Sequence, residues 1–184
     1  MHDLGRVKAP SQILTDRLAL SAPQAVDATS IFERYASDPD VTRYLGWPRH
    51  RSLADTKAFL KLSSEQWERW PAGPYVISQR NNGALIGATG LGFESQSLAV
   101  TGYVFAKDAW GKGYATEALA AIVDIARRIG VAQLYALCHP DHQASRRVLE
   151  KCGFTRDGSW SKLSEFPNLA PGIAKEAFCY RRAL

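Results

Sequence analysis

The chain lacks any long apolar run. Its most apolar stretch, from Ala115 to Ala126, is interrupted by Thr116, Glu117 and Asp124, whereas a membrane-spanning helix needs about 20 predominantly apolar residues. The first eight residues are polar and contain no apolar segment of the kind found in secretory signals. These absences predict no membrane association and no export, and we expect a cytoplasmic protein.

Cysteine is scarce, and its three occurrences show no CxxC spacing. We therefore expect reduced thiols and no metal site. The 184 residues suit one domain, and a hydrophobic share of 46% excludes a disordered chain. The net charge of +5 indicates an anionic ligand or partner, although a solvated basic surface explains the charge equally well.

The residue pattern predicts alternating strands and helices after a loose start, residues 1–13. Asn82-Gly83 is a hairpin turn signal, Ser52 is placed as an N-cap, and Gly130 as a helix C-cap. We expect strands at 17–22, 75–79, 84–91, 99–105, 131–138, 155–163 and 176–182, with helices at 23–37, 53–70, 115–129 and 143–152. The prediction is a mixed α/β (α+β) single domain over residues 14–184, with a right-handed parallel crossover between strands 99–105 and 131–138.

A glycine-rich turn lies between strand 99–105 and the helix that follows it. The segment reads Trp110-Gly111-Lys112-Gly113-Tyr114-Ala115-Thr116. Glycines allow a ligand to approach the backbone, and a helix N-terminus offers free N–H groups to phosphate. The segment is neither a Walker A loop nor a complete dinucleotide fingerprint, because Thr116 occupies the final glycine position. Taken alone, the turn is as compatible with a plain tight turn as with a phosphate site.

A second segment follows about thirty residues later and contains His142, Ser145, Lys151, Gly153 and Phe154. Together the two segments resemble the GNAT superfamily of acyl-CoA-dependent N-acetyltransferases, and WGKGYATEA is typical of its RimJ/RimL-like branch. The chain departs from the superfamily pattern at two positions: Trp110 replaces Gln or Arg, and His142 replaces the usual Asn. The resemblance spans about residue 14 to the C-terminus.

The resemblance implies a twisted mixed sheet that is splayed between its fourth and fifth strands and flanked by helices, with acetyl-CoA as the cosubstrate. Backbone groups of Val104, Phe105 and Ala106 would pair with the pantetheine arm. The turn would hold the pyrophosphate through Trp110, Gly111, Lys112, Gly113, Tyr114, Ala115 and Thr116, and His142, Ser145 and Arg146 would complete the cofactor site. The alternative interpretation of Lys112 and Arg146 is that they are ordinary solvated charges with no contact to the cofactor.

The resemblance also implies that Ser145 donates a proton to the departing thiolate. The alternative is a hydroxyl bonded back to the Asp141 carbonyl within its own helix. The glutamate that many relatives use as a base is missing from strand 99–105. Glu94 is the nearest replacement and His142 is a second candidate base, although a solvated glutamate and a loop histidine without a special role remain alternatives.

Family architecture places the acceptor pocket between the first helices and the last loop. The candidate wall residues are Tyr44, Trp47, Trp67, Trp70, Phe166 and Asn168. Core packing is the competing interpretation for Trp67 and Trp70. The expected acceptor is a primary amine, either a protein N-terminus or a small molecule, and a ribosomal protein and a second copy of the chain are candidate partners. We expect no direct nucleic-acid contact. A non-catalytic acyl-CoA-binding module is the alternative function.

Overall fold

The computed structural model describes residues 7–158 and 162–184. Its centre is a mixed sheet in the order β1-β2-β3-β4-β5-β6-β9-β7, with β8 paired to β9. The strands are β1 (Gln12–Leu14), β2 (Leu18–Ser21), β3 (Pro74–Gln79), β4 (Leu85–Phe93), β5 (Leu98–Phe105), β6 (Gln133–Cys138), β7 (Thr155–Arg156), β8 (Lys162–Glu165) and β9 (Ala174–Ala183). The expected mixed α/β architecture is confirmed.

The helices are α1 (Ala28–Ile31), α2 (Pro39–Thr42), α3 (Leu53–Arg69), α4 (Tyr114–Arg128) and α5 (Gln143–Lys151). Helix α3 begins where the sequence predicts, because the Asp55 carboxylate accepts the Ser52 N–H at 3.0 Å. Helix α4 ends before Gly130, which has a φ of +85°. No helix in the described ranges is both long and apolar enough to cross a membrane.

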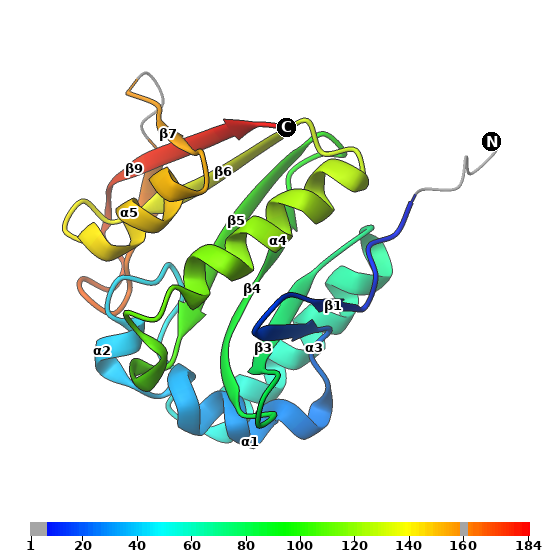
Figure 1. The fold of residues 1–184 in the computed structure, drawn as a ribbon. Coiled ribbons are helices and arrows are strands. Elements are labelled where there is room, and N and C mark those ends of the chain that lie inside the picture. Colours follow the sequence, from blue (N-terminus) through cyan, green and yellow to red (C-terminus); the bar gives the residue numbers. More distant parts are fainter. Residues whose placement is uncertain (1–6, 159–161) are drawn as a thin grey trace.

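The sheet carries helices on both faces, α4 in front and α3 behind in Figure 1. One cluster of buried side chains joins the sheet to α4 and α5 and includes Leu119, Ile122 and Leu149. A second cluster joins the opposite face to α1 and α3 and includes Ile31 and Leu60. The two clusters hold the central strands from either side.

Four segments differ from the sequence prediction. No predicted helix covers α2, a single turn that the Asp38 carboxylate caps by accepting the Asp40 and Val41 N–H groups. The first helix is divided into a 3₁₀ turn at Ala25–Asp27, α1, and a π turn at Phe32–Ala36, because the Ser37 N–H bonds to the carbonyl five residues earlier. The predicted strand 155–163 is only β7 and the start of β8, and residues 159–161 lie outside the described ranges. Strand β1 crosses the expected boundary at residue 14, because Gln12 and Ile13 already pair with β2.

The predicted parallel crossover joins β5 to β6 through α4. The two strands are paired only over Leu98–Val100 and Gln133–Tyr135, and beyond these residues they diverge. With β1 counted, they are the fifth and sixth strands of the chain, and they correspond to the fourth and fifth strands of the sequence prediction. The splay that the family resemblance implies is therefore confirmed.

Candidate functional site

A large cavity lies against the splay. Its volume is about 1160 Å³, and its wall includes Tyr103 and Val104 from β5 and Ala136 and Cys138 from β6. In Figure 1 the open ends of β5 and β6 face the loop after β5, the start of α4 and the start of α5. Residues from both halves of the sheet therefore border one space.

The backbone of β5 alternates between its neighbour β4 and the gap. The Ala106 N–H donates to the Ile86 carbonyl at 2.8 Å, and the register then pairs Val104 with Ala88. In an antiparallel ladder every second residue bonds to the partner strand, so Val104 and Ala106 turn their polar groups toward β4. Of the three residues predicted to meet pantetheine, only Phe105 turns its backbone groups toward the gap.

The glycine turn has the geometry expected of an anion site. Gly111 and Gly113 have φ values of +73° and +79°, which L side chains adopt only with strain. The first intrahelical bond of α4 runs from the Glu117 N–H to the Gly113 carbonyl, so the N–H groups of residues 114–116 have no partner within the helix. A Cβ built at Gly111 meets no atom within 4 Å, so the turn is open to a phosphate-sized group.

An ion pair that the sequence analysis missed fixes this turn. Arg17, on the loop before β2, bonds through Nε to Glu117 at 2.7 Å and through Nη1 to the Lys112 carbonyl at 2.8 Å. The Thr15 hydroxyl also donates to Glu117, at 2.6 Å. Burial raises the pKa of Glu117, but the bonds from Thr15 and Arg17 outweigh burial and hold the pKa below its usual value. We refer to Thr15, Arg17 and Glu117 as the clamp.

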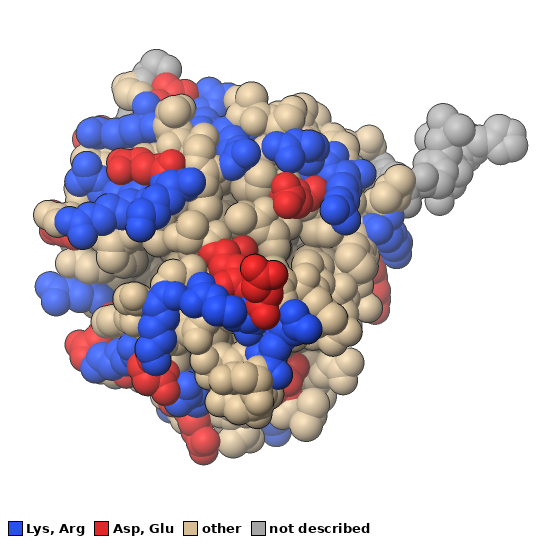
Figure 2. Space-filling model, in the orientation of Figure 1, with Lys and Arg blue, Asp and Glu red and all other residues tan. Residues whose placement is uncertain are grey.

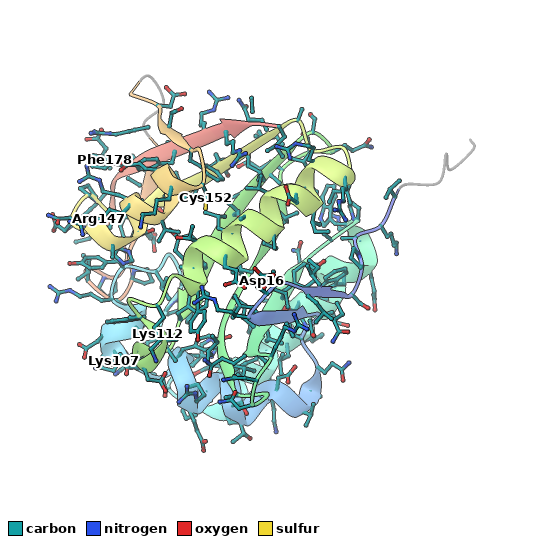
Figure 3. The ribbon with its side chains drawn as sticks, in the orientation of Figure 1. Asp16, Lys107, Lys112, Arg147, Cys152 and Phe178 are labelled. Carbon is teal, nitrogen blue, oxygen red and sulfur yellow. The ribbon has the colours of Figure 1, made fainter. Side chains whose placement is uncertain are left out.

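Lysine and arginine side chains predominate on the face of the molecule that carries the turn. Figure 2 shows them gathered most densely over α5, β7 and β9. In Figure 3, Lys112 lies at the start of α4, close to Lys107, and Arg147 points outward from α5. Lys107 is paired with Asp38 and Asp40, so Lys112 is the cation of this pair that remains available to a phosphate.

Two residues predicted to bind the cofactor make contacts within the protein. The Trp110 indole donates its N–H to the Phe105 carbonyl at 2.7 Å, which ties the start of the turn to the end of β5. The Arg146 guanidinium bonds to the Tyr180 hydroxyl at 3.3 Å and lies over the Phe178 ring. Trp110 remains 49% exposed, whereas the Arg146 guanidinium is engaged by Tyr180 and Phe178.

The Ser145 hydroxyl has a partner that the sequence analysis did not identify. The Tyr103 hydroxyl lies 2.9 Å from Ser145 Oγ and 2.9 Å from the Ser145 carbonyl oxygen, so the bond back to Asp141 is not the one formed. Burial raises the pKa of Tyr103, opposed in part by the Ser145 bond, and the phenol stays protonated. Both residues line the cavity.

The candidate base His142 lies in an aromatic stack. Tyr44 stacks against His142 and His139 with ring centroids 4.9 Å apart in both pairs, and Phe166 packs edge-on against His139 at 4.8 Å. Burial, and then the neighbouring His139, lower the pKa of His142. The imidazole is therefore held neutral, as a proton acceptor must be.

The other candidate base, Glu94, lies just beyond the end of β4. It lines the cavity and accepts a hydrogen bond from the Tyr135 hydroxyl of β6. The contact joins strands on either side of the gap, at the end where β5 and β6 are still paired. Glu94 is exposed, and its bond to Tyr135 holds its carboxylate in the cavity wall.

Three of the predicted acceptor residues line the cavity, namely Tyr44, Trp47 and Phe166. The other three, Trp67, Trp70 and Asn168, do not, and the prediction for them is corrected. Trp67 is a packing residue, because its indole donates to the Pro74 carbonyl at 2.8 Å and its ring meets Tyr75 edge-on at 5.0 Å. Trp70 also packs within the protein, against Phe93.

Asn168 is a structural bridge instead of a wall residue. Its amide Nδ2 donates to the carbonyls of Thr42 and Trp47 at 2.7 and 2.9 Å, and its Oδ1 accepts the Arg49 N–H at 2.8 Å. These three bonds tie the loop before α3 to the loop between β8 and β9. Asn168 therefore holds Trp47 at the cavity, although Asn168 itself is not part of the cavity wall.

Comparison with known proteins agrees with this geometry. The family model described as "Acetyltransferase (GNAT) domain" matches residues 17–155. A Bacillus subtilis protein named "Uncharacterized N-acetyltransferase YoaA" is 29% identical over 147 residues, which are 78% of this chain and 82% of the relative. YkkB of the same organism is 28% identical over 153 residues, 80% of this chain and 87% of the relative.

Solved structures share the fold. The microcin C7 self-immunity acetyltransferase MccE, in complex with acetyl-CoA and AMP, superimposes with a TM-score of 0.82 at 18% identity, covering 97% of this chain and 99% of that one. RimL, the ribosomal L7/L12 α-N-protein acetyltransferase in complex with coenzyme A, gives 0.78 at 20% identity, covering 94% and 97%. A GNAT acetyltransferase from Bacillus anthracis gives 0.77 at 23% identity, covering 94% and 98%.

RimL structures are among those that share the fold, and the family model and the relatives named as N-acetyltransferases favour an enzyme over a non-catalytic binding module. The family model covers well over half of the chain. The chain is therefore an acetyltransferase that belongs to the GNAT domain family.

Proposed function

We propose that this enzyme transfers an acetyl group from acetyl-CoA to a primary amine by direct attack of the amine, without a covalent enzyme intermediate. The observation that carries the proposal is the splay between β5 and β6, with the open glycine turn beyond its wide end and Ser145 on its wall. The arrangement suits a long anionic cosubstrate whose phosphates lie at the start of α4 and whose thiol end reaches Ser145.

The residues of the turn would bind and orient the cosubstrate, which supplies the acetyl group as a thioester. N–H groups of residues 114–116 and the Lys112 side chain would hold the two phosphates. The Phe105 N–H, which faces the gap, would pair with a pantetheine carbonyl, because the Phe105 carbonyl already accepts the Trp110 indole N–H. Holding both reactants in one cavity supplies much of the rate enhancement through positioning alone.

Two proton transfers remain for the side chains. We assign to the Ser145 hydroxyl the proton that the departing thiolate takes up, and to Glu94 the proton that the attacking amine gives up, through a water molecule. The proton held by Glu94 then returns to Ser145 through water, which restores both groups. His142 is the second candidate for the base. Burial raises the pKa of Cys138, which makes its thiol a poor nucleophile and favours direct attack over acyl transfer through the enzyme.

The acceptor proposed here is a protein N-terminus or a small amine with an apolar group beside the nitrogen. The aromatic wall of Tyr44, Trp47 and Phe166 supports the apolar group. RimL is named for a ribosomal protein substrate, which keeps a ribosomal partner among the candidates. Peptides that begin with Ala or Ser, or a hydrophobic amino acid, should exceed spermidine and kanamycin in kcat/KM.

The test is thiol release from acetyl-CoA in the presence of an amine panel. We expect Ser145→Ala to lower turnover by roughly ten- to a thousandfold while CoA affinity changes little. Ser64→Ala, at an exposed position of α3, is the matched control and should leave both unchanged. Full activity in Ser145→Ala would remove the assigned proton donor, and no thiol release with any amine would refute the proposed reaction.

A further inference from the structure

The short segment Trp47–Arg51, between α2 and α3, presents cations to the cavity. We name it the arginine loop. Arg49 and Arg51 both line the cavity, and both side chains are exposed. Neither forms an ion pair in the described ranges, whereas Arg17, Arg34 and Arg181 are each paired with a carboxylate. Within the described ranges, the fold thus leaves two guanidinium groups without an ion-pair partner at the acceptor end of the site.

The arginine loop is held rigidly by its backbone. Asn168 accepts the Arg49 N–H and donates to the Trp47 carbonyl. The His50 N–H donates to the Ala36 carbonyl at 3.0 Å, and the Arg51 N–H donates to Asp55 at 2.8 Å. The bonds are made by main-chain atoms, so both arginine side chains remain available to a ligand.

The cavity wall also carries two carboxylates, Asp55 and Glu94, and each is held by hydrogen bonds from other groups. Asp55 accepts the N–H groups of Arg51 and Ser52, which lower its pKa, and it lies in the first turn of α3, where the helix dipole offsets its charge. Glu94 is bonded to Tyr135. His50 adds no charge, because burial lowers its pKa and its ring is bonded to the Thr56 hydroxyl at 2.9 Å.

We infer that the acceptor carries an anionic group, a carboxylate or a phosphate, close to its amine, and that Arg49 and Arg51 bind this group. The inference rests on the proposed amine acetylation and narrows its substrate class. Guanidinium groups bind both anions through paired N–H donors. The aromatic wall of Tyr44, Trp47 and Phe166 would receive the apolar body of the same molecule, and its amine would point toward Glu94 and the gap.

The test compares three acceptors with the same body: phenylalanine, its amide, and its aminophosphonate analogue. The basicity of the amine differs among the three acceptors. For each protein variant, kcat/KM with an anionic acceptor is therefore divided by kcat/KM with the amide. Comparing this ratio between variants cancels the intrinsic reactivity of the acceptors. We expect the Arg49→Ala/Arg51→Ala protein to lose about tenfold or more of this ratio. Arg49→Lys/Arg51→Lys should retain part of it.

Arg128→Ala, at an exposed position in the last turn of α4 and outside the cavity wall, is the matched control and should leave the ratio unchanged. Ratios that the double alanine variant alters by less than about twofold for both anions would overturn the inference. Loss with only one of the two anions supports it and identifies that anion as the group recognised.

A binding experiment separates this inference from the proposed reaction. N-Acetylphenylalanine and its amide are titrated calorimetrically into the CoA-saturated protein, which requires no turnover. Tighter binding of the carboxylate that disappears in the double alanine variant supports the anion site even if no amine is acetylated. Equal affinity for the two compounds overturns the inference even if amines are acetylated.

Discussion

At the scale of single residues, Tyr103 is the side chain on which the chemistry of Ser145 depends. A serine hydroxyl rotates freely unless a partner fixes it. Tyr103 approaches Ser145 Oγ and the Ser145 carbonyl at equal distances of 2.9 Å. If the phenol donates to the carbonyl, its oxygen accepts the serine proton; if it donates to Oγ, the serine proton is free to point into the gap. Tyr103 is therefore a positioning residue for Ser145.

We expect Tyr103→Phe to lower kcat by about tenfold, the lower end of the general-acid range, with little change in CoA affinity. The phenyl ring keeps the packing and removes only the hydroxyl that orients Ser145. In a Ser145→Ala background the same substitution should have little further effect, because the two residues act as a unit. The measurement is a double-mutant cycle in kcat.

Tyr75→Phe is the control for Tyr103→Phe. Tyr75 is buried, and its hydroxyl donates to the Pro10 carbonyl at 2.8 Å. Tyr75 lies on β3, two strands away from Tyr103 in the sheet. Its loss should lower the free energy of unfolding by about 1 kcal/mol and leave kcat unchanged. An equal loss of kcat in both variants would reduce the role of Tyr103 to packing.

At the scale of elements, the glycine turn between β5 and α4 can be tested against the β3–β4 hairpin turn, which also contains a glycine with positive φ. Gly111 and Gly83 make a matched pair, because both have positive φ (+73° and +70°) and a Cβ at either position meets no atom within 4 Å. Alanine at either should cost about 1–2 kcal/mol of stability through backbone strain. Only Gly111→Ala should weaken CoA binding, because Gly111 belongs to the turn that we propose holds the phosphates, whereas Gly83 lies in the β3–β4 hairpin.

Calorimetric titration of CoA into both alanine variants tests the pair. We expect at least a tenfold loss of affinity for Gly111→Ala, since each misplaced charged hydrogen bond is worth about 1.5–3 kcal/mol, and wild-type affinity for Gly83→Ala. Equal affinities in two equally destabilised proteins would place the phosphates elsewhere.

The clamp gives the start of α4 a dependence on pH. The pKa of Glu117 is lowered in the folded protein from an ordinary value of 4.5, so the clamp stabilises the fold above that value. The contribution is lost as pH falls through the lowered pKa. We expect Glu117→Gln to be less stable than wild type near neutrality and to lose less stability on acidification.

Chemical denaturation at about pH 7 and about pH 4 measures this difference. Glu68→Gln, an exposed glutamate of α3, should follow the wild-type curve at both values. Parallel pH profiles for wild type and Glu117→Gln would show that the clamp carries no titrating contribution.

The elements differ in how well the sequence predicts them. The 82–83 hairpin, α3 and α4 are correct because their signals are local: a turn dipeptide, a capping pair and a single apolar stripe. The 23–37 helix is divided because the Ser37 backbone widens its last turn, which no periodicity reveals. Likewise the glycine turn is contiguous in the sequence and therefore predictable. Arg17, in contrast, lies 100 residues from Glu117, and Tyr103 lies 42 residues from Ser145, so only the fold brings each pair together.

At the scale of the whole molecule, the sheet consists of two halves. Strands β1 to β5 form an antiparallel half, and β6 to β9 form a second antiparallel half. The halves meet in the sheet only over Leu98–Val100 and Gln133–Tyr135, with α4 covering one face of the junction. A cosubstrate in the gap would replace the missing pairing between them.

Cosubstrate binding should therefore stabilise both halves together. At a CoA concentration of about 100 times Kd, the expected gain is about 2.7 kcal/mol, which for a domain of this size raises Tm by roughly 5–10 °C.

Hydrogen exchange should slow on both sides of the gap, at residues 101–105 of β5 and 136–138 of β6, as well as in the first turn of α4. Protection restricted to α4 would mean that the phosphates bind at the turn while the pantetheine arm lies outside the gap, because a ligand between the strands must shield both. Gly111→Ala at the same CoA concentration is the control: with tenfold weaker affinity the expected gain falls to about 1.4 kcal/mol, and protection should weaken at the turn and in both strands together, since the phosphates anchor the arm in the gap.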